Sequence, residues 1–128
     1  MERRSHVRKT VNSVVFHDLT SLKDYSLLAQ QGYLVDASLN GFLIEINRAD
    51  LKSEDLKKNL HLDGLVGQKI ALFLPQMNLD LDGTIVRAAH VGRGSFEIAV
   101  KFSADVPEYW RECLIDLLPG PGELDDHA

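Results

Sequence analysis

The sequence lacks the features that cross-link a protein, insert it into a membrane or direct it to secretion. Its 128 residues include a single cysteine, Cys113, so no disulfide can form within the chain. No apolar run approaches the roughly 20 residues that a helix needs to cross a bilayer. The charged start of the chain leads into no hydrophobic signal-peptide core. We therefore expect a cytoplasmic protein without membrane insertion, of a size suited to one packed core.

Positive charge is also in short supply. The chain has 14 Lys and Arg residues and 19 Asp and Glu residues, which gives a net charge of -5. Domains that bind DNA or RNA tracts are usually basic, so the balance argues against a nucleic-acid partner. The basic residues are unevenly placed, however, because Arg3, Arg4, Arg8 and Lys9 crowd the start of the chain. An acidic protein with a local arginine cluster suits a small anionic ligand.

Patterns typical of catalysis and metal binding are missing as well. The five histidines are scattered, and none pairs with cysteine or carboxylate at a metal-ligand spacing. Neither a Walker-type phosphate loop nor a dinucleotide-fold glycine fingerprint is present. Cys113 falls on an apolar helical stripe and is predicted to be a buried structural thiol. Asp80 and Asp82 alternate with leucines, which predicts a solvated strand face. We therefore expect no enzyme activity, no cofactor and no metal site.

What the sequence does contain is a series of short strand patterns. Alternating and β-branched apolar residues predict six strands, over residues 10–16, 32–35, 42–46, 68–74, 79–86 and 95–102. The segment 24–29 fits either a helical turn or a strand edge. Two glycines within 90–94 predict a hairpin turn, and the segment 53–58 has the pattern of a short capped helix.

The C-terminal part of the chain changes to a helical period. Apolar residues three and four positions apart form one stripe, namely Val106, Tyr109, Trp110, Cys113, Leu114, Leu117 and Leu118. Short strands followed by one such helix predict a small antiparallel β-barrel. The stripe is expected to cover a face of this barrel. A homo-oligomer built through the stripe is an open alternative.

Two segments carry residue types that suit a nucleotide ligand. Arg4 and Arg8 are four residues apart, and guanidinium groups bind phosphate oxygens bidentately or stack on a purine. In the segment 36–41, Asp36 can accept from a guanine edge, Ser38 can reach a base or phosphate, and Gly41 permits a positive φ or a close backbone approach. Taken alone, each segment is explained more simply by a solvated tail or by an Asx or Ser turn.

Together the two segments resemble the signature of the PilZ domain family, which is R-x-x-x-R followed some tens of residues later by [D/N]-x-S-x-x-G. Here it stands as Arg4-Ser5-His6-Val7-Arg8 and Asp36-Ala37-Ser38-Leu39-Asn40-Gly41. The similarity includes the lead-in at Glu2-Arg3 and the strand patterns up to Phe102. It implies a six-stranded antiparallel β-barrel that binds cyclic di-GMP. The longer connection over 48–63, with its short inserted helix, and the C-terminal helix depart from the minimal family barrel.

The resemblance also implies roles for individual residues. Arg4 and Arg8 would clasp a phosphate and a guanine face. Asp36 and Ser38 would read a guanine edge, and Gly41 would shape the turn. We expect the chain to divide into a flexible basic arm (1–10), a barrel with a C-terminal helix (11–118) and a disordered tail (119–128).

The same resemblance suggests ligand contacts for two further arginines. A basic residue at the position of Arg3 tends, in this family, to accompany binding of a stacked pair of cyclic di-GMP molecules. Arg87 lies at a strand end where some relatives supply another basic contact, although an exposed strand arginine is the simpler interpretation. The expected function is that of a cyclic di-GMP receptor or adaptor that signals to an effector protein, whose identity the sequence does not carry.

Other functions have weaker support in the sequence. The leading alternative is a PilZ-like adaptor that acts through protein contacts alone, without a nucleotide. A small hydrolase or transferase would need a nucleophile with its base, or a metal constellation. An RNA-binding barrel would need exposed aromatic residues among basic strands, whereas Phe96 and Phe102 fall on the face expected to form the core.

Overall fold

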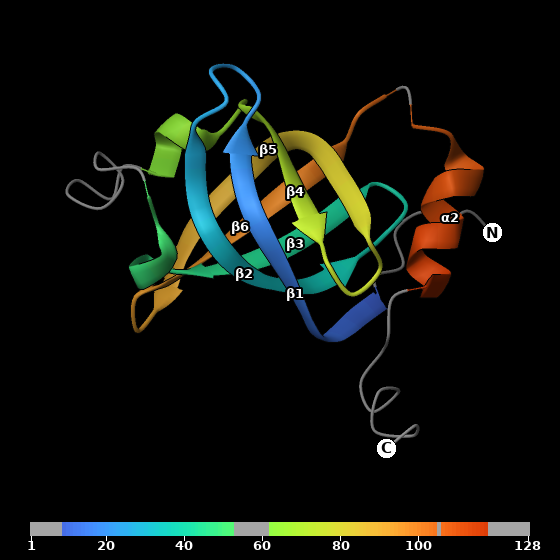
Figure 1. Ribbon diagram of the computed structural model, residues 1–128, viewed down its shortest axis with the longest axis horizontal. Helices are drawn as coiled ribbons and strands as arrows, with labels where there is room; N and C mark the ends of the chain where they lie inside the picture. The colour runs from blue at the N-terminus through green and yellow to red at the C-terminus, as the bar shows by residue number, and fades with distance from the viewer. Residues whose placement is uncertain (1–8, 53–61, 105, 118–128) are drawn as a thin grey trace.

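Six antiparallel strands close into a barrel in a computed structural model that describes residues 9–52, 62–104 and 106–117. The strands are β1 (Lys9–Ser21), β2 (Leu27–Ala37), β3 (Gly41–Asn47), β4 (Lys69–Leu74), β5 (Leu79–Gly92) and β6 (Ser95–Phe102). They are paired in the order β1-β2-β3-β6-β5-β4, and β4 pairs with β1 to close the ring (Figure 1). Every strand thus has a neighbour on both sides, which removes the open edges that promote aggregation.

Three short helical elements join or follow the strands in the described part of the chain. They are the 3-10 turns η2 (Arg48–Asp50) and η3 (Leu62–Leu65) and the helix α2 (Glu108–Leu117). The barrel with a C-terminal helix predicted from the sequence is therefore confirmed. The helix predicted over 53–58, residues 1–8 of the predicted arm and the predicted tail lie outside the described residues. No helix among the described residues is both long and apolar enough to cross a membrane.

Four of the observed strands extend beyond the predicted ranges, β6 matches its range, and β4 begins one residue later than predicted, at Lys69. Strand β1 begins at Lys9 and runs on to Ser21, and β2 already begins at Leu27. Within the ambiguous segment 24–29, the last three residues therefore belong to a strand. The reason is a tertiary contact, since Ala29 pairs with Leu19 on β1 and both side chains are buried in the barrel. Cross-strand burial of this kind outweighs weak local preference.

Side chains fill the barrel interior. Alternate positions of the strands point inward, and the largest fully buried side chains are Phe16, Leu19, Leu34, Ile44, Ile46, Ile70, Leu72, Leu74, Leu81, Ile85, Phe96 and Ile98. Full burial of one such side chain stabilises the fold by about 1.5–3 kcal/mol. Asp80 and Asp82 flank the buried Leu81 and are exposed, as the alternation predicts. A ligand must therefore bind outside this packed interior, on the barrel surface or at one of its ends.

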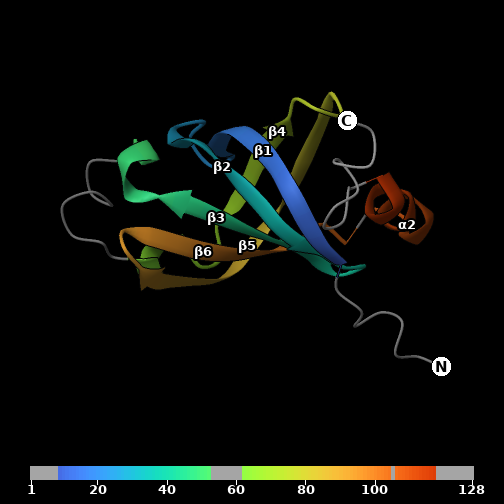
Figure 2. The same cartoon turned by 90° about the horizontal axis from the view of Figure 1, so that it is seen from below.

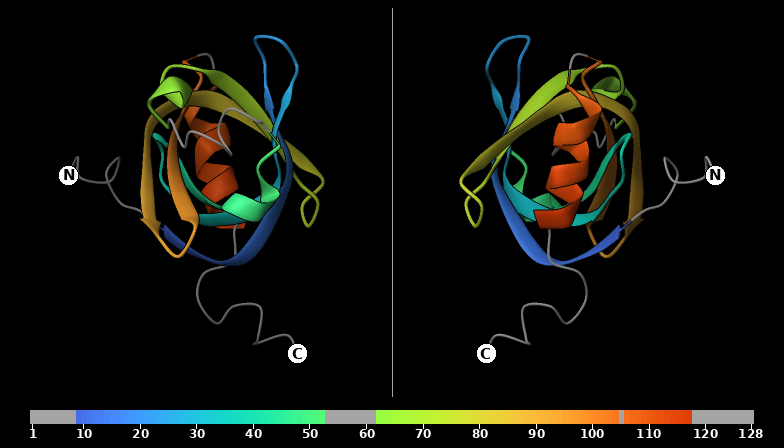
Figure 3. Two further views of the ribbon diagram at one scale, coloured as in Figure 1. Left: turned by 90° about the vertical axis from the view of Figure 1, so that its left-hand side faces the viewer. Right: turned by 90° about the vertical axis from the view of Figure 1, so that its right-hand side faces the viewer.

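Helix α2 lies across one open end of the barrel (Figures 2 and 3). Leu114 is buried in the core cluster, and Trp110 and Ile115 pack partly buried against it. The Trp110 ring meets the Phe102 ring edge-on, with centroids 6.2 Å apart. The helix thus covers the barrel end with positions 110, 114 and 115.

The prediction that Cys113 is buried is wrong, because this thiol is exposed. Tyr109 and Leu117 are 71% and 65% exposed, so three of the six described members of the predicted stripe face away from the barrel. Residues 109, 113 and 117 are four positions apart and share one side of the helix. A short helix across a barrel end makes only a narrow contact, and that contact falls on the neighbouring side.

The hairpin predicted near residues 90–94 is confirmed. Strand β5 ends at Gly92 and β6 begins at Ser95, which leaves Arg93 and Gly94 as the loop. Their φ angles are 53° and 77°. Two-residue hairpin loops of type I′ need a positive φ at both positions, because their twist then matches that of the strands.

Candidate functional site

The segment Asp36-Ala37-Ser38-Leu39-Asn40-Gly41 contains the turn between β2 and β3, since β2 ends at Ala37 and β3 begins at Gly41. This turn lies at the barrel end that α2 covers. The backbone N–H of Ser38 donates to the Gly41 carbonyl (2.8 Å), and that of Asn40 donates to Ser38 Oγ (3.2 Å). The Asn40 carbonyl in turn accepts from the N–H of Phe102 (2.9 Å). These bonds hold the turn closed on itself and tie it to the end of β6.

Ser38 is 6% exposed, which is unusual for a serine in a turn. Its oxygen accepts a hydrogen bond from the Asn40 N–H and so closes a Ser turn. The structural role that the sequence suggested for this serine is therefore present. A hydroxyl group can donate as well as accept. The same side chain that shapes the turn can therefore also donate a hydrogen bond to a ligand.

Gly41 is required by a close backbone approach. A Cβ atom at this position would run into the carbonyl group of Val100 on the neighbouring strand β6 and meet the Cα of Lys101. Its φ is not among the positive values. Of the two reasons for a glycine that the sequence left open, close approach is thus the one that the structure supports.

Asp36 stands at an irregularity in the sheet. It pairs with Thr10 on β1 and with Leu43 on β3, and the β2–β3 register shifts between Leu34 and Asp36. Such bulges re-aim side chains and are frequent beside functional sites. The Asp36 side chain is half-buried and lies two residues before the turn that begins at Ser38.

A surface groove of about 430 Å³ runs from this turn onto the outer faces of β5 and β6. We call it the Ser38 groove, and its lining residues are Ser38, Asn40, Gly41, Phe42, Val86, Arg87, Ala99, Val100 and Lys101. Arg87 is an exposed strand arginine, which is the simpler of the two interpretations of this residue. It also lines the same groove as Ser38 and Gly41. The groove therefore combines hydrogen-bonding groups of the turn with two cations and an apolar strip.

The structure brings together some of the predicted site residues. Ser38 and Gly41 line the groove, whereas Asp36 is not among the lining residues. Arg3, Arg4 and Arg8 lie outside the described residues. The structure does describe the residues that follow them, since Lys9 pairs with Ala37 and Thr10 pairs with Asp36. The described chain thus begins directly beside the turn.

Lys101 lines the groove but was not predicted from the sequence. It alternates with buried residues of β6 and pairs with Gly41 across the β3–β6 ladder. That pairing joins residues 60 positions apart, so no local motif contains it. The alternation alone places Lys101 on the outer face, and the strand order would have been needed to place it beside Gly41.

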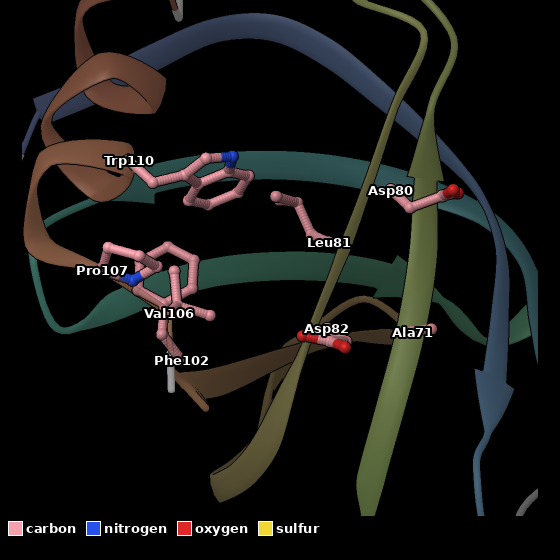
Figure 4. Close-up of a pocket in the computed structure, with 8 residues that line it drawn as sticks. All are labelled: Ala71, Asp80, Leu81, Asp82, Phe102, Val106, Pro107 and Trp110. Carbon is pink, nitrogen blue, oxygen red and sulfur yellow. The ribbon is translucent and has the colours of Figure 1, made fainter. Parts of the chain in front are cut away.

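A second cavity, of about 320 Å³, lies between α2 and the barrel (Figure 4). Trp110 from the helix and Leu81 from β5 point toward one another across it, and Asp80 and Asp82 stand on its strand side. Two carboxylates and no lining cation make this cavity unfavourable for a phosphate group. The Ser38 groove is therefore the better candidate for an anionic ligand.

Two observations limit the chemistry of the described residues. No group of three or more metal-binding side chains occurs among them. Hydrogen bonds from the side chain and backbone of Ser26 lower the pKa of Asp24, with its carboxylate 2.7 Å from Ser26 Oγ. This carboxylate stabilises the β1–β2 turn, at the end of β1 opposite to Lys9, and it belongs to the local fold of that turn.

Fold and groove together define a small β-barrel with an anion-compatible site at one end. The sequence profile of the PilZ domain matches residues 2–119. The chain therefore belongs to the PilZ domain family. A search of curated protein sequences finds no significant match.

Three solved structures share the fold. The PilZ domain of YcgR from Escherichia coli, solved with c-di-GMP, has a TM-score of 0.54 and 19% identity, over 92% of each chain. YcgR from Escherichia coli in complex with c-di-GMP has a TM-score of 0.57 and 20% identity, over 91% of this chain and 45% of that one.

The third is the K. pneumonia MrkH–c-di-GMP complex, with a TM-score of 0.59 and 15% identity, over 91% of this chain and 52% of that one. At these identities the likeness concerns the fold alone. This chain matches about half the length of the chains in the YcgR and MrkH complexes.

Proposed function

We propose that this chain is a cyclic di-GMP receptor that binds the nucleotide in the Ser38 groove and passes the signal to a partner protein. The observation that carries the proposal is the meeting of Ser38 and Gly41 with Arg87 and Lys101 in one groove. Family membership and three neighbours of the same fold solved with c-di-GMP support the choice of ligand. The proposal assigns the chain no catalytic activity.

The roles of the side chains follow from their chemistry. Arg87 and Lys101 place positive charge where a phosphate would lie, and a guanidinium can bind phosphate oxygens in a fork. Ser38 and Asp36 supply a hydroxyl and a carboxylate, which can bind the polar edge of a guanine. Arg4 and Arg8 on the preceding arm would add a phosphate clasp and a stacking surface, because the described chain begins beside this turn.

Isothermal titration calorimetry with cyclic di-GMP tests the proposal, with GTP and cyclic di-AMP as controls. We expect saturable binding of cyclic di-GMP alone. A stoichiometry of two nucleotides per chain would support the role of Arg3 in binding a stacked pair, and one per chain would refute it. Absence of binding to a folded protein would overturn the receptor function.

The arm is tested by Arg8→Ala. Truncating one member of a desolvated charged contact costs about 2–5 kcal/mol, so we expect binding to fall below detection while the barrel stays folded. Lys23→Ala is the matched control, since it removes one positive charge from an exposed position in the turn between β1 and β2. Wild-type affinity in a folded Arg8→Ala variant would contradict the assignment.

A nucleotide-independent adaptor is the second candidate function. It is favoured by the outer side of α2, where Tyr109 and Leu117 are largely exposed and could contact another protein. The same titration separates the two candidates. An adaptor of this kind would show no heat with cyclic di-GMP and would keep its protein contacts when Ser38 or Arg87 is substituted.

A further inference from the structure

Arg111 of helix α2 donates to three backbone carbonyls, two in the connection between β6 and α2 and one in the β2–β3 turn. Its Nε donates to Val106 (3.1 Å), one Nη to Ser103 (3.0 Å) and the other Nη to Leu39 (3.0 Å). The guanidinium carbon also lies 5.5 Å from the centroid of the Phe102 ring. This one half-buried side chain thus joins the helix, the end of β6 and the β2–β3 turn.

The contact with Leu39 is the one that bears on the proposed ligand site. Leu39 lies between Ser38 and Asn40, inside the turn that borders the groove, and is 72 residues away from Arg111. The turn is tied to the rest of the barrel end by this bond and by the bond from Phe102 N–H to the Asn40 carbonyl. Arg111 makes the first of these bonds, and its guanidinium lies over the ring of Phe102, the residue whose N–H makes the second.

The geometry of this contact requires an arginine. A planar guanidinium carries five N–H donors in a rigid fork, so it can hold carbonyls in three directions at once. A lysine ammonium is a compact charge with a different donor geometry and cannot span the same three acceptors. The separation of the three carbonyls is therefore matched to the fork, beyond a general need for positive charge.

We propose that Arg111 is a positioning residue for the nucleotide-binding turn. By fixing the Leu39 carbonyl, it holds the Ser38 hydroxyl and the Gly41 backbone in the arrangement that the ligand meets. The entropy of ordering the turn is then lost during folding and not during binding, which raises affinity. This proposal rests on the proposed function, because it concerns the same groove. It adds that part of the affinity originates in a helix that does not line the groove.

Two substitutions test the role of the fork. Arg111→Met keeps an extended apolar side chain over Phe102 but removes every donor, and Arg111→Lys keeps the charge but not the fork. Ordering about one residue of the turn during binding, when it is no longer ordered during folding, corresponds to roughly a tenfold loss of affinity. We expect both variants to bind cyclic di-GMP about tenfold more weakly in calorimetry. Lys23→Met, which removes a charge from an exposed turn remote from Ser38, should bind like the wild type.

Amide hydrogen exchange in the ligand-free protein provides the second measurement. In Arg111→Met, the amides of Ser38 and Phe102 should exchange faster, while the amide of Ile44 in β3 keeps its protection. A purely structural role would raise exchange throughout the barrel and leave the affinity of the folded fraction unchanged. That result, or wild-type affinity in both folded variants, would overturn the proposal.

The two measurements separate failure of this inference from failure of the proposed function. If the wild-type protein does not bind cyclic di-GMP, the receptor function fails whatever Arg111 does. Local exchange at Ser38 and Phe102 then still decides whether Arg111 orders the turn. Unchanged exchange there in a folded Arg111→Met variant would overturn the positioning role on its own.

Discussion

Gly41 lies beside the groove, where the backbones of strands β3 and β6 approach each other closely. A Cβ at this position meets the Val100 carbonyl, and backbone atoms of a closed barrel cannot move away cheaply. We expect Gly41→Ala to lower the free energy of unfolding by about 1–3 kcal/mol, measured by urea denaturation. Binding of cyclic di-GMP should weaken as well, because the added Cβ would displace Gly41 and with it the neighbouring turn that contains Ser38.

Gly64→Ala is the matched control for this substitution. An added Cβ there meets nothing within 4 Å, and the backbone φ of Gly64 is not positive. We expect its stability to stay within about 0.5 kcal/mol of the wild type. Equal stability of the Gly41 and Gly64 variants would show that the approach to β6 is not what requires a glycine.

At the scale of single residues, the sequence revealed local signals and missed distant ones. The pattern around Ser38 and Gly41 marked the turn correctly, because all its members lie within six positions. Lys101 and Arg111 come from segments that only the closed barrel brings to this turn, so no local pattern contained them. The choice between a positive φ and a close approach at Gly41 also depended on the register with β6.

For helix α2, the sequence predicted the element but not the face that it buries. Its period was predicted correctly, since apolar residues recur every three to four positions. The face that the barrel end covers could not be predicted from that period. Leu114 is buried, whereas Cys113 next to it is exposed, because the width of the contact depends on the shape of the barrel end.

The β5–β6 hairpin offers a test of turn chemistry. Arg93 adopts a φ of 53°, which is unfavourable for a side chain that does not bond locally, and Gly94 follows it at 77°. Asn is strongly preferred before Gly in type I′ loops. We expect Arg93→Asn to stabilise the protein by about 0.5–1 kcal/mol, measured by thermal or urea unfolding.

The ligand site provides the check on this hairpin variant. Neither Arg93 nor Gly94 lines the Ser38 groove, so the affinity for cyclic di-GMP should not change. A variant that is less stable than the wild type would contradict the type I′ interpretation of the loop. A change in affinity alone would instead indicate a ligand contact at the hairpin.

At the scale of the whole molecule, the strands could be predicted from local patterns, but their order in the barrel could not. The alternation of apolar residues predicts strands wherever one face is buried. The order β1-β2-β3-β6-β5-β4 has no such local signal, because β3 pairs with β6 and β1 with β4 far along the chain. The pattern of short strands predicted a small antiparallel β-barrel, and the resemblance to the PilZ family agreed with it in implying six strands.

Because the barrel is one closed unit, a ligand bound at one end should stabilise all of it. A ligand that binds only the folded state stabilises it by RT ln(1 + [L]/Kd), which is about 2.7 kcal/mol at a free concentration of 100 times Kd. For a domain of this length, that free energy corresponds to a rise in Tm of roughly 10 °C. We expect cyclic di-GMP to produce this rise in a thermal unfolding experiment followed by circular dichroism.

Matched variants connect this rise to the proposed site. Arg8→Ala should lose nearly all of the shift, because its ligand-free fold is intact but its affinity is not. Lys23→Ala should keep the full shift, since it changes the net charge by the same amount without touching the turn at Ser38. A shift of equal size in Arg8→Ala would mean that the nucleotide binds without Arg8, and Arg4, Arg87 and Lys101 would then have to carry the phosphate contacts.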